Sequence, residues 1–241
     1  MEFRTPLLIS AFPSVLLFLL SLVSIILNAH YWILGDWIMG KWIRVADVAT
    51  MTKFIDIVIE YVDTETNATI VALSLSFATG ILGFIAWTQL RRSDYDNEYN
   101  ESRRRFYTGS TMLMSLASFC ASLVALIFHY TKQGNDKEYK GCSSEFRNTE
   151  NWILYCTREA GACNVLEEWH SSIFVVKNWA AALACREAKA VKWLLIPIML
   201  CDVAIFTLIG MQAWNRRKTR YQRVDGIISH GKDPVFQSKY Q

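Results

Sequence analysis

Residues 191–213 read VKWLLIPIMLCDVAIFTLIGMQA, and this stretch decides the class of the fold. Three other stretches are equally apolar, at residues 7–28, 68–90 and 109–130. A helix that crosses a bilayer needs ~20 mostly apolar residues, and each stretch meets that length. A chain of 241 residues is too short to cover four such helices with polar layers. The sequence therefore predicts an all-α membrane protein built on a four-helix transmembrane bundle.

Arginines lie close to the ends of the apolar stretches on one predicted side of the bilayer, in residues 91–108 and 214–241. Positively charged residues beside helix ends mark the cytoplasmic side of a membrane. We therefore expect both termini to be cytoplasmic, in a protein of the plasma membrane or the endomembranes. The expected order is the N-terminus and first helix at 1–28, a first extracellular loop at 29–67, the second helix at 68–90, a cytoplasmic loop at 91–108, the third helix at 109–130, a large extracellular loop at 131–190, the fourth helix at 191–213 and a basic cytoplasmic tail at 214–241.

Four of the six cysteines lie in the large extracellular loop, at Cys142, Cys156, Cys163 and Cys185. An even number of cysteines on the oxidising side of a membrane is typical of disulfide bonds. The sequence predicts two disulfides that stabilise this domain, and it leaves all three pairings open. A zinc site is the alternative, but the cysteines lack the Cys-x2-Cys spacing of such sites, so we expect no metal.

The spacing of apolar residues predicts that the extracellular domain is largely helical. Residues 44–62 are expected to form an amphipathic helix, because Lys53, Asp56 and Glu60 share one face at helical spacing. This helix would pack on the cysteine-bearing loop, or it would lie in the membrane interface. A second helical pattern starts at residue 164 and continues towards the fourth apolar stretch, which predicts one long helix.

Asp202 is an acidic residue at the centre of the fourth apolar stretch. A carboxyl group at this depth is costly unless it is neutralised or paired. We expect an intramembrane polar contact, either with a hydroxyl group of a neighbouring helix or with a partner's membrane helix. The candidates for the hydroxyl group are Thr79, Ser118 and Ser122. An ion or proton pathway is the alternative for Asp202.

Small residues recur four positions apart in the second and third apolar stretches, as Ser76 and Gly80 and as Ala117 and Ala121. This spacing lets helix backbones approach closely, within one bundle or against another membrane protein.

The basic tail has two readable features. Arg216, Arg217, Lys218 and Arg220 would anchor the helix end and attract anionic lipid of the inner leaflet. Tyr221 and Val224 fit the tyrosine-x-x-bulky-apolar pattern of a sorting motif.

Catalytic and cofactor motifs are absent from the sequence, including Gly-rich phosphate loops, His-Glu-x-x-His and Gly-x-Ser-x-Gly. We therefore expect a protein that is not an enzyme, without cofactors or nucleic-acid partners. Its expected partners are the lipid bilayer and either other integral membrane proteins or further copies of itself.

This layout resembles that of the tetraspanins, with four helices, both ends inside, and cysteines confined to the larger of two outer loops. The position of Cys185, just before the fourth helix, also resembles that family. The family's Cys-Cys-Gly motif is absent, and the nearest text is Gly161-Ala-Cys163. Claudin-like proteins match less well, because the first outer loop lacks a Trp-Leu-Cys motif, and MARVEL-type four-helix proteins stay an alternative. The tetraspanin resemblance implies an organiser that binds other membrane proteins laterally.

The leading hypothesis for function is a non-enzymatic membrane scaffold or accessory subunit that associates laterally with other membrane proteins. The alternative is an oligomeric channel or transporter component that uses Asp202.

Overall fold

A computed structural model describes residues 4–38, 42–46, 54–91, 101–131, 141–148, 151–165 and 178–230. Four helices are long and apolar enough to cross a membrane, which is consistent with an integral membrane protein. They are α1 (Arg4–Ile33), α2 (Thr64–Leu90), α3 (Glu101–Thr131) and α5 (Asn178–His230). Each helix extends beyond the apolar stretch that predicts it, because polar residues at its ends continue the helical turns.

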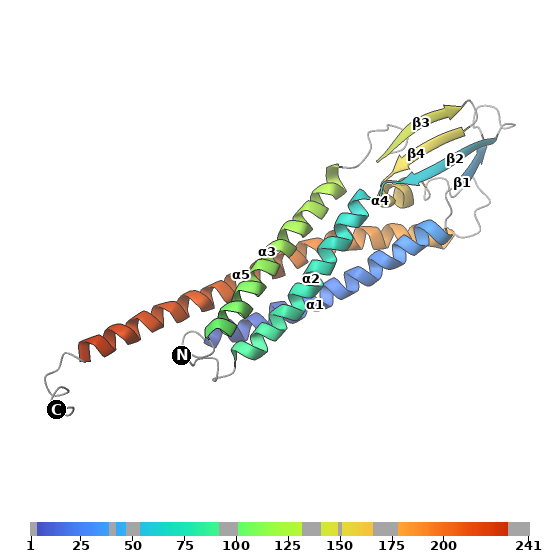
Figure 1. Ribbon diagram of the computed structural model, residues 1–241. Helices are drawn as coiled ribbons and strands as arrows, with labels where there is room; N and C mark the ends of the chain where they lie inside the picture. Colours follow the sequence, from blue (N-terminus) through green and yellow to red (C-terminus); the bar gives the residue numbers. More distant parts are fainter. Residues whose placement is uncertain are drawn as a thin grey trace.

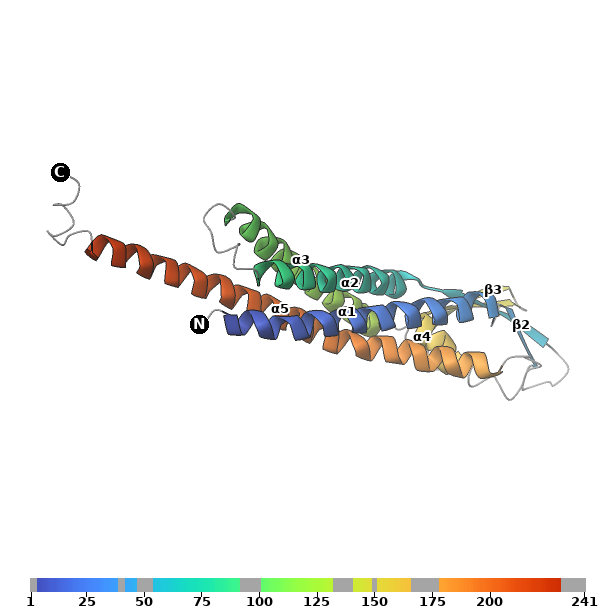
Figure 2. The same ribbon diagram turned by 90° about the horizontal axis from the view of Figure 1, so that it is seen from below.

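The four long helices form a bundle in which α1 packs against α2 and α5, and α3 also packs against α2 and α5. α1 begins and α5 ends at one end of the bundle, and a β-sheet lies at the other end (Figure 1). Figure 2 shows α5 continuing past the other helices on the side away from the sheet. The expected long helix is present from residue 178 onwards, and residues 166–177 lie outside the described part of the chain.

Small hydroxyl residues and branched apolar residues share the interior of the bundle. Leu17, Leu73, Leu195 and Ile205 are buried in its apolar core. Several buried hydroxyls bond back to their own helices, as Ser76 Oγ does when it donates to the carbonyl oxygen of Ala72 over 2.8 Å. These short side chains satisfy their own polarity and let neighbouring helices approach closely.

The sheet joins the two chain segments that connect the long helices at this end. It has four strands in the order β1-β2-β4-β3. The antiparallel strands β1 (Trp42–Ala46) and β2 (Phe54–Tyr61) lie between α1 and α2 in the chain. The antiparallel strands β3 (Cys142–Asn148) and β4 (Asn151–Cys156) lie between α3 and α5. Parallel pairing of β2 with β4 unites the two hairpins into one sheet.

The prediction of an amphipathic helix at residues 44–62 is wrong, because the described part of that range contains the strands β1 and β2. The expectation of a largely helical domain therefore fails at the sheet. In β2 the side chains of Ile57 and Ile59 are buried, whereas Glu60 between Ile59 and Tyr61 is exposed. This alternation has the period of a strand, and the β-branched residues of FIDIVIEY favour a strand as well.

Two short helical turns lie between β4 and the bundle, and another extends α1. They are α4 (Arg158–Ala160), the π-helical turn η4 (Gly161–Val165) and the π-helical turn η1 (Leu34–Ile38). Val165 of η4 is buried with Ile59 of β2 and Leu154 of β4 in a second hydrophobic core under the sheet. This core gives the sheet a buried face of its own, separate from the interior of the bundle.

Both expected disulfides are present, and the structure selects one of the three pairings. Cys142 is bonded to Cys156, and the two residues lie directly opposite each other in β3 and β4. Cys163 is bonded to Cys185, which links η4 to the first turns of α5. The first bond closes a hairpin, and the second fastens η4, which follows the sheet in the chain, to α5.

Candidate functional site

Ionisable side chains gather where the sheet meets the bundle, and we call this group the charged junction. It is formed by Asp36, Asp63, Glu65, His129, Arg158, Glu159 and Lys192.

At the centre of the charged junction, His129 of α3 lies between two carboxyl groups. Its Nδ1 atom is 3.6 Å from Glu65 Oε2 and 3.7 Å from Glu159 Oε2. His129 is 3% exposed and Glu65 is 2% exposed. The other ring nitrogen, Nε2, is 3.2 Å from the hydroxyl of Thr69. The end of α3 is thus joined through one imidazole to the start of α2 and to α4.

Lys192 completes this contact from α5. Its Nζ atom donates to both carboxylate oxygens of Glu159 over 3.3 Å and lies 4.4 Å from the centre of the Tyr130 ring. Burial alone would raise the pKa of Glu159, but contact with His129 and the positive charge of Lys192 outweigh it. The pKa of Glu159 is therefore lower than that of an ordinary glutamate.

Arg158 forms the second half of the charged junction. Its guanidinium donates to Asp63 Oδ1, with Nε at 2.9 Å, and to Asp36 Oδ2, with Nη2 at 3.1 Å. It also stacks over the rings of Trp32 and Tyr61, at 5.6 and 5.0 Å from their centres. One buried arginine therefore connects α1, the end of β2 and the start of α4 through charge and aromatic contact.

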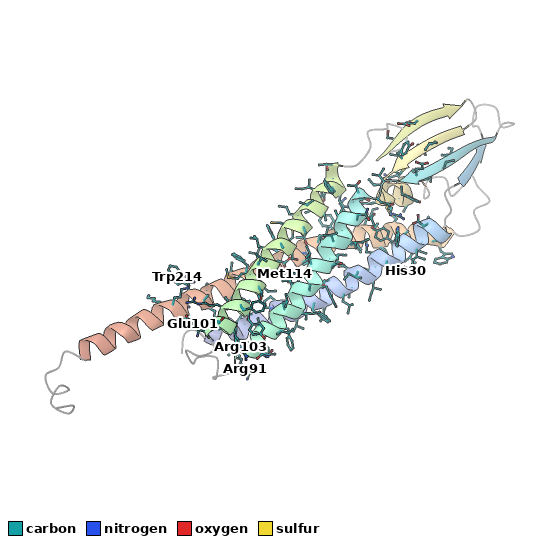
Figure 3. The ribbon with its side chains drawn as sticks, viewed as in Figure 1. His30, Arg91, Glu101, Arg103, Met114 and Trp214 are labelled. Carbon is teal, nitrogen blue, oxygen red and sulfur yellow. A yellow bond between two sulfur atoms is a disulfide. The ribbon has the colours of Figure 1, made fainter. Side chains whose placement is uncertain are left out.

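Tyr61 shows how dry this region is. Burial raises the pKa of Tyr61 to about 12, although the positive charge of Arg158 acts in the opposite direction. A further polar contact lies nearby, where His30 Nδ1 is 2.8 Å from both carboxylate oxygens of Glu187. Figure 3 places His30 at the sheet end of α1. This contact fastens α1 to α5 beside the charged junction.

Asp202 lies inside the bundle, and its side chain is 0% exposed. Ser118 Oγ of α3 donates to Asp202 Oδ2 over 2.7 Å, and Ser115 Oγ donates to the backbone carbonyl oxygen of Asp202 over 2.6 Å. Ser118 also lies 2.8 Å from Ser76 Oγ, so a chain of polar contacts crosses from α2 through α3 to α5. Of the three hydroxyl candidates suggested by the sequence, Ser118 is the one that contacts Asp202.

The residues expected at helix contacts lie in two different settings. Gly80 is buried against α1, where an added Cβ would lie 2.9 Å from the backbone nitrogen of Phe18. Ser76 is buried against α3. Ala117 is exposed on the outer surface of α3, and Ala121 is half-buried there. The first pair therefore packs within the bundle, and the second pair lies at its surface.

The expected basic and sorting residues lie on α5, from the end of the bundle away from the sheet onwards. Arg216 donates to the carbonyl oxygen of Leu90 over 3.3 Å, and Arg217 and Lys218 are exposed. The backbone of α5 includes Arg220, Tyr221 and Val224. The side chains of these three residues lie outside the described part of the structure.

Sequence reasoning missed the charged junction. Glu65 stands three residues before the second apolar stretch and Lys192 is the second residue of the fourth, and charged residues at such positions are usually solvated. Arg158 and Glu159 stand in a loop that no motif singles out. A carboxylate before one apolar stretch and a lysine at the start of another were visible in the sequence, but only the fold shows that both side chains reach the same buried region.

Within the described ranges, no group of three His, Cys, Asp or Glu side chains is placed to hold a metal ion. The charged junction holds buried charged groups in contact and joins α1, α3, α4 and α5. The Asp202 contact joins α3 to α5. Comparisons with protein-family models, with curated proteins and with solved structures found no match.

Proposed function

We propose that this protein is a non-enzymatic membrane scaffold or accessory subunit that associates laterally with another integral membrane protein. The observation that carries this proposal is an apolar groove of about 470 Å³ between α2 and α3. The groove lies along helices that are apolar enough to span a membrane. It is lined by Thr64, Asn67, Ala68, Val71, Cys120, Ala121, Val124 and Phe128.

Small side chains produce the groove. Ala121 and Cys120 form part of its floor and wall, and the neighbouring Ala117 is exposed one turn away on α3. Larger side chains such as Val71 and Val124 stand exposed beside them. A notch of small residues between branched ones lets the backbone of a second helix pack closely, which drives helix association in a bilayer.

The sheet domain supports the same proposal because ionic contacts and a disulfide attach it to the helices. The charged junction and the bond between Cys163 and Cys185 fasten it to α1, α3 and α5. Among the described residues, β1 and β3 each pair with another strand on one side only. Sheet edges bind extended segments of other chains. A partner in the groove would therefore meet a second binding surface on the same protein.

We further propose that the sheet faces the exterior or a lumen, and that both termini are cytoplasmic. Two disulfides beside the sheet fit an oxidising compartment. Arg91 and Arg103 lie at the opposite end of the bundle (Figure 3), as expected for the cytoplasmic side. This orientation fits the plasma membrane or the endomembranes.

Photo-crosslinking in native membranes tests the proposal. A benzophenone amino acid is placed at Val124 in the groove and, as a matched control, at Leu200, an exposed apolar position on α5. We expect one membrane protein to be crosslinked in near-stoichiometric yield from Val124 and not from Leu200. The substitution Ala121→Phe fills the groove and should abolish the adduct, whereas Leu200→Phe should leave it unchanged.

An adduct between two copies of this chain would identify the partner as a second copy, so that the protein forms a homo-oligomer. Equal labelling of many proteins from both positions, or an adduct that survives Ala121→Phe, would overturn the proposed binding surface.

A channel or transporter component is the second candidate function. It is favoured by one observation, which is that Asp202 Oδ1 is buried without a hydrogen-bond partner among the described residues. Conductance of the purified protein in planar bilayers tests this candidate. A current that changes with Asp202→Asn would support it, and a silent bilayer at high protein density would count against it.

A further inference from the structure

The end of the bundle away from the sheet contains a pocket of about 750 Å³ between α3 and α5. This volume falls within the ~300–1,000 Å³ of typical small-molecule sites. Arg104 and Arg105 of α3 and Arg216 and Arg217 of α5 line the pocket together with one acidic residue, Glu101. Arg105 Nη2 donates to Glu101 Oε1 over 2.7 Å, so one of the four guanidinium groups is paired with the single carboxylate and the pocket keeps an excess of positive charge.

The floor of the pocket differs from its basic rim. It includes the apolar side chains of Leu90 and Met112 and the side chain of Gln212. Gln212 is 2% exposed, and its Nε2 atom has no hydrogen-bond partner among the described residues. A buried amide donor without a partner is costly, and it is satisfied when an acceptor atom of a ligand enters. The pocket thus combines cationic donors, a buried neutral donor and apolar walls.

Aromatic side chains place the pocket at the level of the lipid headgroups. Trp214 on α5 is 71% exposed and Phe106 on α3 is 69% exposed, and both stand within a few residues of the pocket-lining arginines. Figure 3 shows Trp214 near Glu101 at this end of the bundle. Exposed aromatic residues of this kind collect at the membrane–water interface, where basic pockets between helices bind phosphorylated headgroups.

We infer that this pocket binds a phosphate-bearing anion of headgroup size, and that its source is a polyphosphorylated inositol lipid of the adjoining leaflet. Planar guanidinium groups bind phosphate oxygens through paired hydrogen bonds, and several such groups favour a ligand with more than one phosphate. Gln212 would donate to an oxygen near the glycerol end of the headgroup. The walls formed by Leu90 and Met112 would contact the start of the acyl chains. This inference does not depend on the lateral partner proposed above.

Titration of the purified full-length protein in neutral detergent tests the site, with bound ligand counted by native mass spectrometry. The probes are dioctanoyl phosphatidylinositol bisphosphate, dioctanoyl phosphatidylserine, inositol trisphosphate and inorganic phosphate. We expect one molecule of the inositol lipid to bind, and phosphatidylserine to bind at least ~10-fold more weakly because it lacks phosphomonoester groups. If inositol trisphosphate binds as tightly as the inositol lipid, the pocket is still a phosphate site, but its ligand is a soluble molecule and not a lipid.

Two double variants of equal charge separate the pocket from general attraction. Arg105→Gln with Arg217→Gln removes two exposed arginines that line the pocket. Arg103→Gln with Lys218→Gln removes two exposed basic residues that are their sequence neighbours and are not among the lining residues. The first double variant should weaken binding by ~10-fold or more, and the second by less than ~3-fold.

Gln212→Leu gives an independent measurement, because it leaves every charge in place and removes the buried donor. It should weaken binding of the inositol lipid while the thermal midpoint of the protein stays the same or rises. Equal loss in the two double variants, or equal affinity for phosphatidylserine and the inositol lipid, would overturn the inference and leave only diffuse electrostatic attraction.

Discussion

Lys192 Nζ lies 3.3 Å from both carboxylate oxygens of Glu159, and this contact ties α5 to α4, the short helix that follows β4. Lys192 is 8% exposed, so its charge has little solvent to compensate for a lost partner. The attachment of the sheet to the bundle therefore depends on an ionic contact in a dry place.

Lys192→Met should strongly destabilise the protein. Removing Lys192 leaves the Glu159 carboxylate with the longer 3.7 Å contact to His129 in place of a full ion pair, which costs about 3 kcal/mol. Combining Lys192→Met with Glu159→Gln should recover part of that loss, because neither charge is then buried alone. Unfolding in mixed micelles, followed by tryptophan fluorescence, measures the free energies. Lys189→Met, an exposed position one turn earlier, is the control, and an equal loss there would contradict the ionic explanation.

Acid should weaken the same contact. The pKa of Glu159 is lowered in the folded protein, so its contribution to stability is complete above the ordinary glutamate value of 4.5. That contribution disappears as the pH falls from 4.5 through the lower folded pKa, since protonation removes the charge that faces Lys192 and His129. We expect the free energy of unfolding of the wild type to fall more steeply in this window than that of Glu159→Gln. Parallel curves for the two proteins would refute the prediction.

Asp202 and Ser118 should be energetically coupled. Their hydrogen bond joins α3 to α5 inside the bundle, and such bonds in membrane proteins contribute about 0.6 kcal/mol on average and up to ~2 kcal/mol. A double-mutant cycle with Asp202→Leu and Ser118→Ala measures the coupling directly. Thr207, whose hydroxyl bonds to the carbonyl of Val203 on its own helix, provides the control as Thr207→Val. It should show no coupling to Asp202→Leu.

Gly80→Ala should separate α1 from α2. The added Cβ would lie 2.9 Å from the backbone nitrogen of Phe18, so the helices must move apart, at a cost of about 1–3 kcal/mol. Gly109→Ala is the matched control, because nothing lies within 4 Å of a Cβ at that position. The control should be neutral or more stable by up to ~1 kcal/mol, since alanine favours a helix over glycine. Equal effects of the two substitutions would show that the close approach at Gly80 is unimportant.

The sequence determined the four long helices because a membrane-spanning helix is a local property. A helix of ~20 apolar residues forms all its backbone hydrogen bonds within one segment. Residues 191–213 therefore predict a helix without reference to the rest of the chain. The number of disulfides was determined in the same way, from four cysteines in one loop. The polar contact of Asp202 could also be anticipated, because a buried carboxyl group requires a partner wherever it lies.

The tertiary structure alone decided the sheet, the charged junction and the disulfide pairing. β2 pairs with β4 although α2 and α3 lie between them in the chain, and no local pattern specifies such a distant strand. Residues 54–61 carry both helical and alternating spacing, and the parallel partner resolves the ambiguity in favour of the strand. Glu65, His129, Glu159 and Lys192 come from four separate segments and meet because the bundle and the sheet close around them. Long-range packing, which short stretches of sequence do not encode, therefore creates the site.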